Sequence, residues 1–174
     1  AAFYNQFPFV YPDTGTYINS GFMGEVPNDR PIFYGLFLRH ISLHHSLWFV
    51  ILVQAYFCSL LIYKTLDIFY EVKNHFHYLL LITILSLLTG YSFNVSLLIP
   101  DIFTSIGILC IINLWFNSKL KKYELILFQI LFVFSLITHF SNILVILALL
   151  LTFCVINYYR FKKERWIVPW EKVR

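Results

Sequence analysis

Residues 11–46, YPDTGTYINSGFMGEVPNDRPIFYGLFLRHISLHHS, hold most of the polar chemistry of a chain that is otherwise very apolar. Asp, Glu, Arg and His side chains occur eight times in this stretch. After Ser46 the chain becomes a series of hydrophobic segments. This division predicts an extracytoplasmic loop, residues 1–46, carried by a membrane-embedded helical scaffold.

The composition excludes an ordinary soluble domain. Hydrophobic residues make up 59% of the 174 residues and charged residues only 13%, whereas soluble domains contain about 25% charged residues. A soluble chain of this length could not bury so much apolar surface. A bilayer removes the difficulty because apolar side chains can face hydrocarbon.

Five hydrophobic segments approach the ~20 residues that a membrane-spanning helix needs. They are expected at about residues 47–66, 76–91, 100–116, 123–139 and 142–159. The predicted fold class is therefore an all-α polytopic membrane protein with about five transmembrane helices. The predicted organisation is the loop with a short interfacial helix over 1–46, a transmembrane helical bundle over 47–160 and a basic tail over 161–174.

The basic residues are distributed unevenly between the two sides of this arrangement. Eleven of the 13 fall on one side, and only Arg30 and Arg39 fall on the other. Because cytoplasmic loops carry an excess of Lys and Arg, the polar loop is predicted to lie outside the cytoplasm and the basic tail inside it. Trp166 and Trp170 in that tail are expected to be interfacial anchors. An external N-terminal segment requires either its own translocation or a preceding span, and we expect the second.

The polar loop divides into two parts. Residues 11–31 are rich in Gly, Pro, Asn and Asp, which favour turns over helices. After Pro31, apolar residues recur at helical spacing, interrupted by Arg39, His40 and His44. This pattern predicts a short helix over about residues 32–45 that lies in the membrane interface.

Two aspartates are candidates for chemistry at the outer face. A low-dielectric surrounding disfavours an ionised carboxylate unless it is paired or coordinated, so Asp13 is predicted to act as a base or a cation ligand. The alternative is a turn aspartate that caps residues 14–16. Asp101 begins the third apolar segment, where ionisable groups are often functional. The alternative is an acid favoured by the helix dipole.

Asp29 and Arg30 lie in the turn before Pro31. Arg30 is predicted to hold phosphate, because guanidinium donors match phosphate oxygens, with a local ion pair to Asp29 as the alternative. Each charge is costly beside hydrocarbon, and pairing or a bound ion lowers that cost. We therefore expect Asp13, Arg30 and Asp101 to share one pocket.

The histidines do not predict a metal centre. His40, His44 and His45 form an H-x-x-x-H-H pattern that resembles a histidine box of membrane desaturases and hydroxylases. Such di-iron sites need several boxes on one membrane side, and His75 and His77 are predicted on the other. We expect interfacial histidines and no bound transition metal, with a mononuclear site as the alternative.

Several short motifs resemble the N-terminal region of the GT-C glycosyltransferases, polytopic enzymes that take sugars from polyprenyl-phosphate carriers. YPDTGTYI places Asp13 where the family has an acid near the start of its first external loop. NDRPIFYGLF, residues 28–37, resembles the run into the interfacial helix, and residues 46–54 resemble the start of the next span. Pro100-Asp101 falls where a later external turn often carries a second acid. The similarity covers roughly residues 8–105, although the family usually has more spans.

The resemblance implies a membrane glycosyltransferase, or a module of one, that transfers a hexosyl or pentosyl group from a polyprenyl-phosphate donor at the extracytoplasmic face. Asp13 would be the catalytic base or would bind a divalent cation, Mg²⁺ or Mn²⁺, and activity without a cofactor stays open. The donor would be bound by Asp29, Arg30, Arg39, His44 and Asp101.

A non-catalytic membrane subunit that packs within a larger complex is the alternative function. Aromatic residues make up 20% of the chain, and they give large contact areas at low entropy cost. Gln54, inside the first predicted span, is expected to hydrogen-bond a neighbouring helix. The partners we expect are membrane lipid, the polyprenyl-phosphate sugar donor and other membrane subunits, and nucleic acid is not among them.

Overall fold

The computed structural model describes residues 1–70 and 75–163, and these ranges are helical apart from their connections and one isolated bridge. The helices in them are α1 (Ala2–Asn5), α2 (Pro12–Met23), α3 (Phe33–Ser42), α4 (Trp48–Tyr70), α5 (His75–Leu88), α6 (Tyr91–Ser96), α7 (Ile102–Phe116), α8 (Lys122–Thr138) and α9 (Phe140–Lys163). The predicted anchors Trp166 and Trp170 lie outside the described residues.

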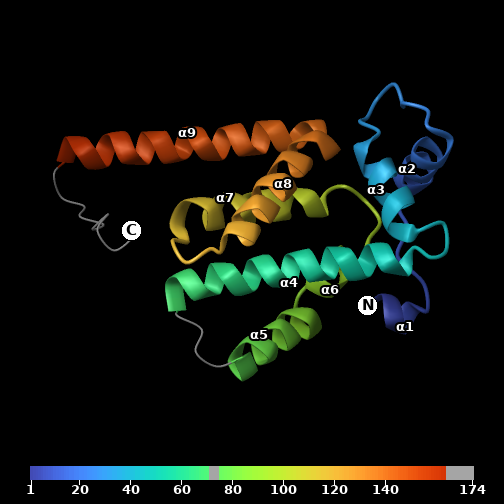
Figure 1. The fold of residues 1–174 in the computed structure, drawn as a ribbon, viewed down its shortest axis with the longest axis horizontal. Helices are drawn as coiled ribbons and strands as arrows, with labels where there is room; N and C mark the ends of the chain where they lie inside the picture. Colours follow the sequence, from blue (N-terminus) through green and yellow to red (C-terminus); the bar gives the residue numbers. More distant parts are fainter. Residues whose placement is uncertain (71–74, 164–174) are drawn as a thin grey trace.

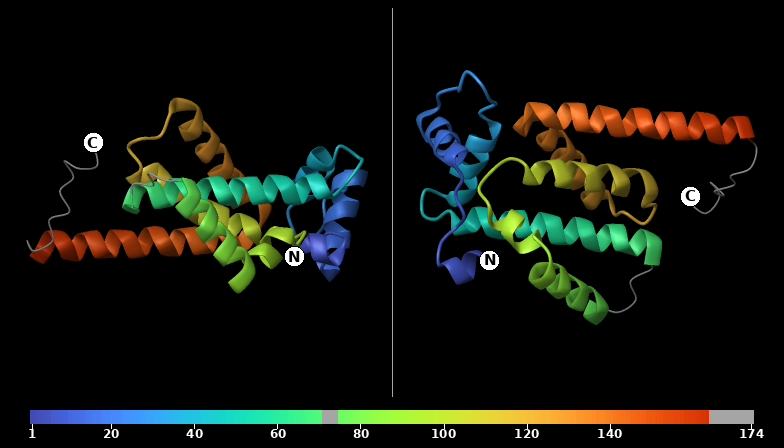
Figure 2. Two further views of the ribbon diagram at one scale, coloured as in Figure 1. Left: turned by 90° about the horizontal axis from the view of Figure 1, so that it is seen from below. Right: turned by 180° about the vertical axis from the view of Figure 1, so that it is seen from behind.

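The long helices form an array with the N-terminal helices at one end. α4 and α8 both pack on α7, α9 contacts α7 and α8, and α2 packs on α3. Figure 1 shows α1, α2 and α3 gathered where α4 begins, close to the corner between α8 and α9. The two further views in Figure 2 show the same gathering, with the C-terminal part of α9 projecting at the other end.

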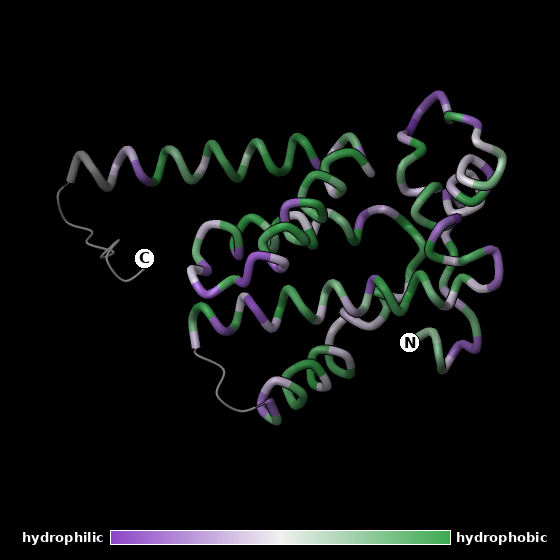
Figure 3. The backbone as a smooth tube through the Cα atoms, in the orientation of Figure 1, coloured by the Kyte–Doolittle hydropathy of each residue, from purple (hydrophilic) through white to green (hydrophobic). Residues whose placement is uncertain are grey.

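A helix lies at each of the five predicted apolar segments, namely α4, α5, α7, α8 and α9. Apolar residues run along these helices, and polar residues gather in the connections and the N-terminal part (Figure 3). Within the described ranges, two helices are long and apolar enough to cross a membrane, α4 with 23 residues and the 20 residues Phe140–Tyr159 of α9. At 1.5 Å per residue, α4 is about 34 Å long, against a hydrocarbon thickness of ~30 Å. The chain is therefore all-helical in its described part, with two helices that could span a membrane.

The prediction of turns over residues 11–31 was wrong for its first half, which forms α2. Pro12 occupies the first turn, where its missing N–H costs nothing, and the Tyr11 N–H donates to Thr14 Oγ1 at 2.8 Å. Packing against α3 then outweighs the weak helix propensity of the composition, since tertiary contacts routinely override propensity. α2 ends at Gly24, whose φ of 79° is readily adopted only by glycine.

The predicted helix over residues 32–45 is confirmed as α3, which is four residues shorter than expected, one at its start and three at its end. Leu43 ends it with a left-handed φ of 52°. The aromatic side chains of α3 join the core: Tyr34 is fully buried and its ring packs edge-on against Tyr17 of α2 and Phe103 of α7. This cluster attaches the N-terminal helices to the long helices.

Gln54 hydrogen-bonds neighbouring segments, as expected for a polar residue within an apolar helix. Its side chain is fully buried. Gln54 Oε1 accepts from the Tyr34 hydroxyl at 3.2 Å, and Nε2 donates to the backbone oxygens of Val95 and Leu97 at 3.1 and 3.3 Å. The amide therefore ties α4 to α3 and to the C-terminal end of α6.

Replacing Gln54 with Leu is expected to destabilise the fold strongly. The Tyr34 hydroxyl and two backbone oxygens would lose their partner in a buried site, at a cost of ~1–3 kcal/mol for each group left unsatisfied. Thermal unfolding in detergent micelles measures the effect. Gln129→Leu is the matched control, because Gln129 in α8 is exposed; equal unfolding midpoints for the two variants would contradict the assignment.

The opposite end of the array is held by a second polar cluster. Lys64 Nζ of α4 lies 2.7 Å from Glu124 Oε1 of α8, and Glu124 Oε2 accepts from the Lys121 N–H at 3.0 Å. Asn113 of α7 is fully buried and donates to Thr65 Oγ1 at 2.7 Å. These contacts fix the end of α4 against the α7–α8 connection, at the far end from α2 and α3 (Figure 1).

Candidate functional site

The segment before α2 is hydrogen-bonded to the segment before α7. The Phe9 N–H donates to the Ser96 oxygen at 3.1 Å, and the Leu98 N–H donates to the Phe9 oxygen at 3.0 Å. Thr14 Oγ1 adds a third bond, to the Leu98 oxygen at 2.9 Å. Residues 84 positions apart are thereby joined, and the start of α2 is placed beside the start of α7.

A pocket lies where these segments meet the corner between α8 and α9. Its volume is about 310 Å³, and it is lined by Tyr11, Asp13, Tyr17, Ile99, Pro100, Asp101 and His139. Small-molecule sites commonly begin at ~300 Å³. The expectation that Asp13 and Asp101 share one pocket is confirmed, whereas Arg30, expected in the same pocket, is not one of its lining residues and reaches it only through contacts with Asp13 and Tyr17. We call this cavity the acidic pocket.

Asp13 does not cap its own helix. The hydroxyl of Thr14 takes the Tyr11 N–H instead, so the carboxylate of Asp13 is left for other partners. Asp13 Oδ1 lies 3.1 Å from Arg30 Nη1, and its side chain is 51% exposed. The capping alternative is therefore excluded, and Asp13 stands as a half-exposed carboxylate beside a fixed cation.

Arg30 is held by three neighbours, two of which line the acidic pocket. Its Nε and Nη2 donate to Asp29 Oδ2 at 3.0 and 2.5 Å, and its guanidinium lies 5.3 Å from the centre of the Tyr17 ring. Nη1 is buried and has no hydrogen-bond acceptor among the described residues. Its 3.1 Å approach to Asp13 is thus an ion pair without hydrogen-bond alignment. Arg30 Nη1 therefore has unused hydrogen-bonding capacity beside Asp13.

These contacts shift two pKa values in opposite directions. The hydrogen bonds that Arg30 donates to Asp29, together with the nearby carboxylate of Asp13, raise the pKa of Arg30 above its ordinary value, and the same hydrogen bonds lower the pKa of Asp29. Burial raises the pKa of Tyr17. At neutral pH the site therefore contains a permanent cation and a phenol that keeps its proton.

Asp101 lies directly before α7, at its N-cap position, but its side chain makes no capping hydrogen bond. The Thr104 N–H is taken by the backbone oxygen of Asp101 at 3.0 Å. The carboxylate is exposed and borders the acidic pocket. Asp101 therefore lies at a helix N-terminus, where the dipole favours an acid, as the alternative interpretation expected. Its side chain is free to contact a ligand.

Arg39 and His44 do not line the acidic pocket. Arg39 Nη1 donates to the Gly21 oxygen at 3.4 Å, and the His44 ring packs edge-on against Phe22 at 5.0 Å. Both contacts are with the last turn of α2. That turn lies eight or nine residues after Asp13, or about 12 Å along the helix.

The described residues contain no group of three or more His, Cys, Asp or Glu side chains placed to hold a metal ion. His40 Nδ1 lies 2.7 Å from the Leu36 oxygen of its own helix, which is a local contact. The acidic pocket supplies two carboxylates. Mg²⁺ can bind through one or two carboxylates when waters and substrate phosphates complete its coordination.

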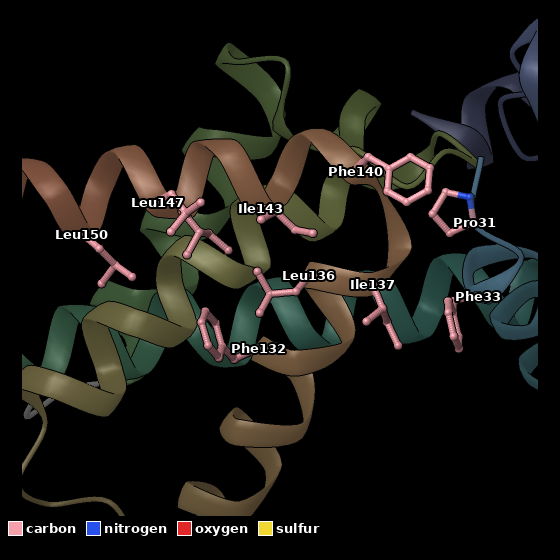
Figure 4. Close-up of a pocket in the computed structure, with 10 residues that line it drawn as sticks. Pro31, Phe33, Phe132, Leu136, Ile137, Phe140, Ile143, Leu147 and Leu150 are labelled. Atoms are coloured by element: carbon pink, nitrogen blue, oxygen red, sulfur yellow. The ribbon is translucent and has the colours of Figure 1, made fainter. Parts of the chain in front are cut away.

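An apolar groove of about 430 Å³ is formed by the start of α3, α8 and α9. It is lined by Pro31, Phe33, Phe132, Leu136, Ile137, Phe140, Ile143, Ile146, Leu147 and Leu150. In Figure 4, Pro31 and Phe140 lie at one end of the groove and Leu150 at the other. Phe140 follows His139, so the chain passes from the pocket lining to the groove lining at the corner between α8 and α9. Pro31 follows Arg30, which contacts the pocket residues Asp13 and Tyr17.

Sequence reasoning singled out the two aspartates and Arg30 but missed His139 and the aromatic walls Tyr11 and Tyr17. His139 occupies the connection between two apolar segments on the predicted outer side, which was the available signal. Tyr11 and Tyr17 could not be distinguished in the sequence from the many other aromatic residues of the chain. Comparisons with protein-family models, with curated proteins and with solved structures give no match for this chain.

Proposed function

We propose that the chain is a membrane-embedded glycosyltransferase, or a module of one, that takes a sugar from a polyprenyl-phosphate donor at the extracytoplasmic face. The observation that carries the proposal is the pairing of two carboxylates in one pocket, Asp13 and Asp101, beside an arginine with an unused N–H group. Transfer to a hydroxyl requires a base, and donor binding requires a cation for the phosphate. Asp13 and Arg30 can supply this base and this cation, and Asp13 Oδ1 lies 3.1 Å from Arg30 Nη1.

The roles follow from the contacts of each side chain. Asp13 is half exposed and would take the proton from the acceptor hydroxyl. Arg30, held by Asp29 through two hydrogen bonds, would direct Nη1 to a phosphate oxygen. Where a divalent cation takes part, Asp13 and Asp101 are the available carboxylates, and the donor phosphate would supply further ligands.

The apolar groove fits the other part of such a donor. A polyprenyl phosphate has a charged head and a long hydrocarbon chain, so its site must join a polar pocket to an apolar surface. Pro31 and Phe33 of the loop and the facing sides of α8 and α9 form that surface next to Arg30. The chain of the donor would lie along α9 and continue into lipid.

We further propose five membrane spans, formed by α4, α5, α7, α8 and α9, with the acidic pocket outside the cytoplasm. α5, α7 and α8 contain 14, 15 and 17 residues, or about 21–26 Å. Short spans are accommodated by local thinning of the bilayer or by snorkelling of flanking residues. The excess of basic residues at the opposite end of the array supports this orientation.

Cysteine labelling tests this topology. Glu25 and Ser118 are exposed and lie in the polar loop and in the α7–α8 connection, respectively. In a background with the exposed Cys154 replaced by Ser, Glu25→Cys is expected to react with an impermeant maleimide from outside sealed cells. Ser118→Cys is expected to react only after permeabilisation. Reaction of both from the same side would contradict the five-span arrangement.

Donor turnover tests the function. Membranes containing the full chain are supplied with polyprenyl-phosphate-linked radiolabelled sugars, hexoses and pentoses separately. Release of polyprenyl phosphate, and label in a new product, are expected above membranes without the chain. Turnover of none of the donors, together with co-purification of the chain in one stable complex with other membrane proteins in mild detergent, would favour the non-catalytic subunit instead.

A further inference from the structure

His139 stands at the corner where α8 ends and α9 begins, and it lines the acidic pocket. Its Nδ1 contacts two groups of Ser141. The Ser141 N–H donates to Nδ1 at 3.3 Å, and Ser141 Oγ lies 2.7 Å from the same nitrogen. Nε2 has no hydrogen-bond partner among the described residues.

The backbone contact determines where the ring carries its proton. A backbone N–H can only donate, so Nδ1 must accept, and a neutral imidazole then carries its hydrogen on Nε2. The Ser141 hydroxyl can donate to the same lone pair and strengthens this arrangement. His139 therefore offers an Nε2–H donor on the side of the ring that Ser141 does not occupy.

The corner that carries His139 is held by buried hydrogen bonds. Asn142 is fully buried; its Nδ2 donates to the Ser135 oxygen at 2.7 Å and its Oδ1 accepts from Thr104 Oγ1 at 2.5 Å. These bonds join α7, α8 and α9 at the corner that carries His139. A group fixed in this way is preorganised, because its position does not have to be found again when a ligand binds.

Binding a phosphate in this pocket requires hydrogen-bond donors. Ionised carboxylates only accept hydrogen bonds, so Asp13 and Asp101 cannot bind the oxygens of a phosphate directly. Arg30 supplies one unused N–H group from the loop side. His139 supplies a second from the α8–α9 corner, without adding a charge that would pair with the carboxylates.

We propose that His139 is a ligand-binding residue of the acidic pocket, donating from Nε2–H to an oxygen of the donor phosphate, with Ser141 as its positioning residue. The proposal rests on the proposed function for the identity of the ligand. A purely structural role, in which the Nδ1 contact caps α9, makes a different prediction for the two amide replacements of His139.

Replacing His139 with Asn or with Gln distinguishes the role of Nδ1 from the role of Nε2. His139→Asn places an amide oxygen near the position of Nδ1, where Asn is a good helix cap, and has no atom at the position of Nε2. His139→Gln reaches the Nε2 position with an NH₂ donor but caps poorly. Binding of polyprenyl phosphate in detergent micelles and the thermal unfolding midpoint are measured for both variants.

For His139→Asn we expect an unchanged unfolding midpoint and an affinity about tenfold lower, as for loss of one hydrogen bond to a charged group. For His139→Gln we expect a lower midpoint with affinity closer to that of the unchanged chain. Unchanged affinity in His139→Asn, or equal loss in both variants, would overturn the role of His139.

The outcome also separates this inference from the proposed function. Sugar transfer by the unchanged chain, with normal affinity in His139→Asn, rejects the role of His139 alone. The expected binding pattern without any sugar transfer rejects the transferase and keeps His139 as a phosphate ligand. No binding of polyprenyl phosphate by the unchanged chain rejects both.

Discussion

Replacing Asp13 with Asn is expected to lower the rate of sugar transfer by about 100-fold or more, since a positioned general base contributes ~10²–10⁴-fold. Asn has nearly the same shape but cannot accept the proton of the acceptor hydroxyl. The fold should be little affected, because the side chain of Asp13 is 51% exposed and contacts Arg30 without a hydrogen bond, and an ion pair that water screens contributes only ~0–1 kcal/mol. Arg30 keeps both of its hydrogen bonds to Asp29 in this variant.

The measurement is the rate of donor turnover at saturating donor, together with the thermal unfolding midpoint in micelles. Glu25→Gln is the control, because it removes an exposed acid from the same loop outside the acidic pocket. The control is expected to retain full activity. Full activity in Asp13→Asn would remove Asp13 from the mechanism, and a large fall in its unfolding midpoint would assign it a structural role.

Replacing Gly21 with Ala is expected to separate α2 from α3. A Cβ at Gly21 would overlap the backbone oxygen of Gly35, and a Cβ at Gly35 would overlap the Tyr17 oxygen. The obstacle in each case is backbone, which cannot rotate away as a side chain can. Overpacking commonly costs ~1–3 kcal/mol and occasionally more, and we expect this variant at or above that upper value.

Gly15→Ala is the matched control for this prediction. Gly15 lies in the same helix, and nothing lies within 4 Å of an added Cβ there. Ala is favoured over Gly in a helix interior by ~1 kcal/mol, so Gly15→Ala should be equally or more stable. Equal stability of the Gly21 and Gly15 variants would show that α2 and α3 do not pack as closely as described. Loss of α2 should also abolish the acidic pocket, because α2 supplies Asp13 and Tyr17.

Hydrophobic patterning predicted the positions of the long helices because an apolar run of sufficient length must be helical to satisfy its backbone in a low-dielectric medium. It also predicted that Gln54 hydrogen-bonds a neighbouring helix, since a lone amide in an apolar run needs a hydrogen-bond partner. The helix at Phe33–Ser42 followed from its apolar spacing in the same way. These features depend on residues close together in the sequence.

The sequence did not predict α2, because its composition favours turns and the stabilising contact is the close approach of Gly21 to Gly35. Arg39 and His44 were chemically suitable phosphate ligands, but the direction of α2 places their contacts at its far end from Asp13. Nothing in the local sequence specifies that direction. It follows from the backbone pairing of Phe9 with the segment at Ser96–Leu98.

The sequence by itself thus determined an apolar helical scaffold, its charge asymmetry and the candidate pair Asp13 and Asp101. Those properties depend on composition and on short-range periodicity. Only the tertiary structure decided that the two carboxylates share a pocket with His139 and that Arg30 retains an unused N–H group beside it. Contacts between segments far apart in the chain depend on how whole helices pack, and packing is a property of the assembled surfaces, which no single segment contains.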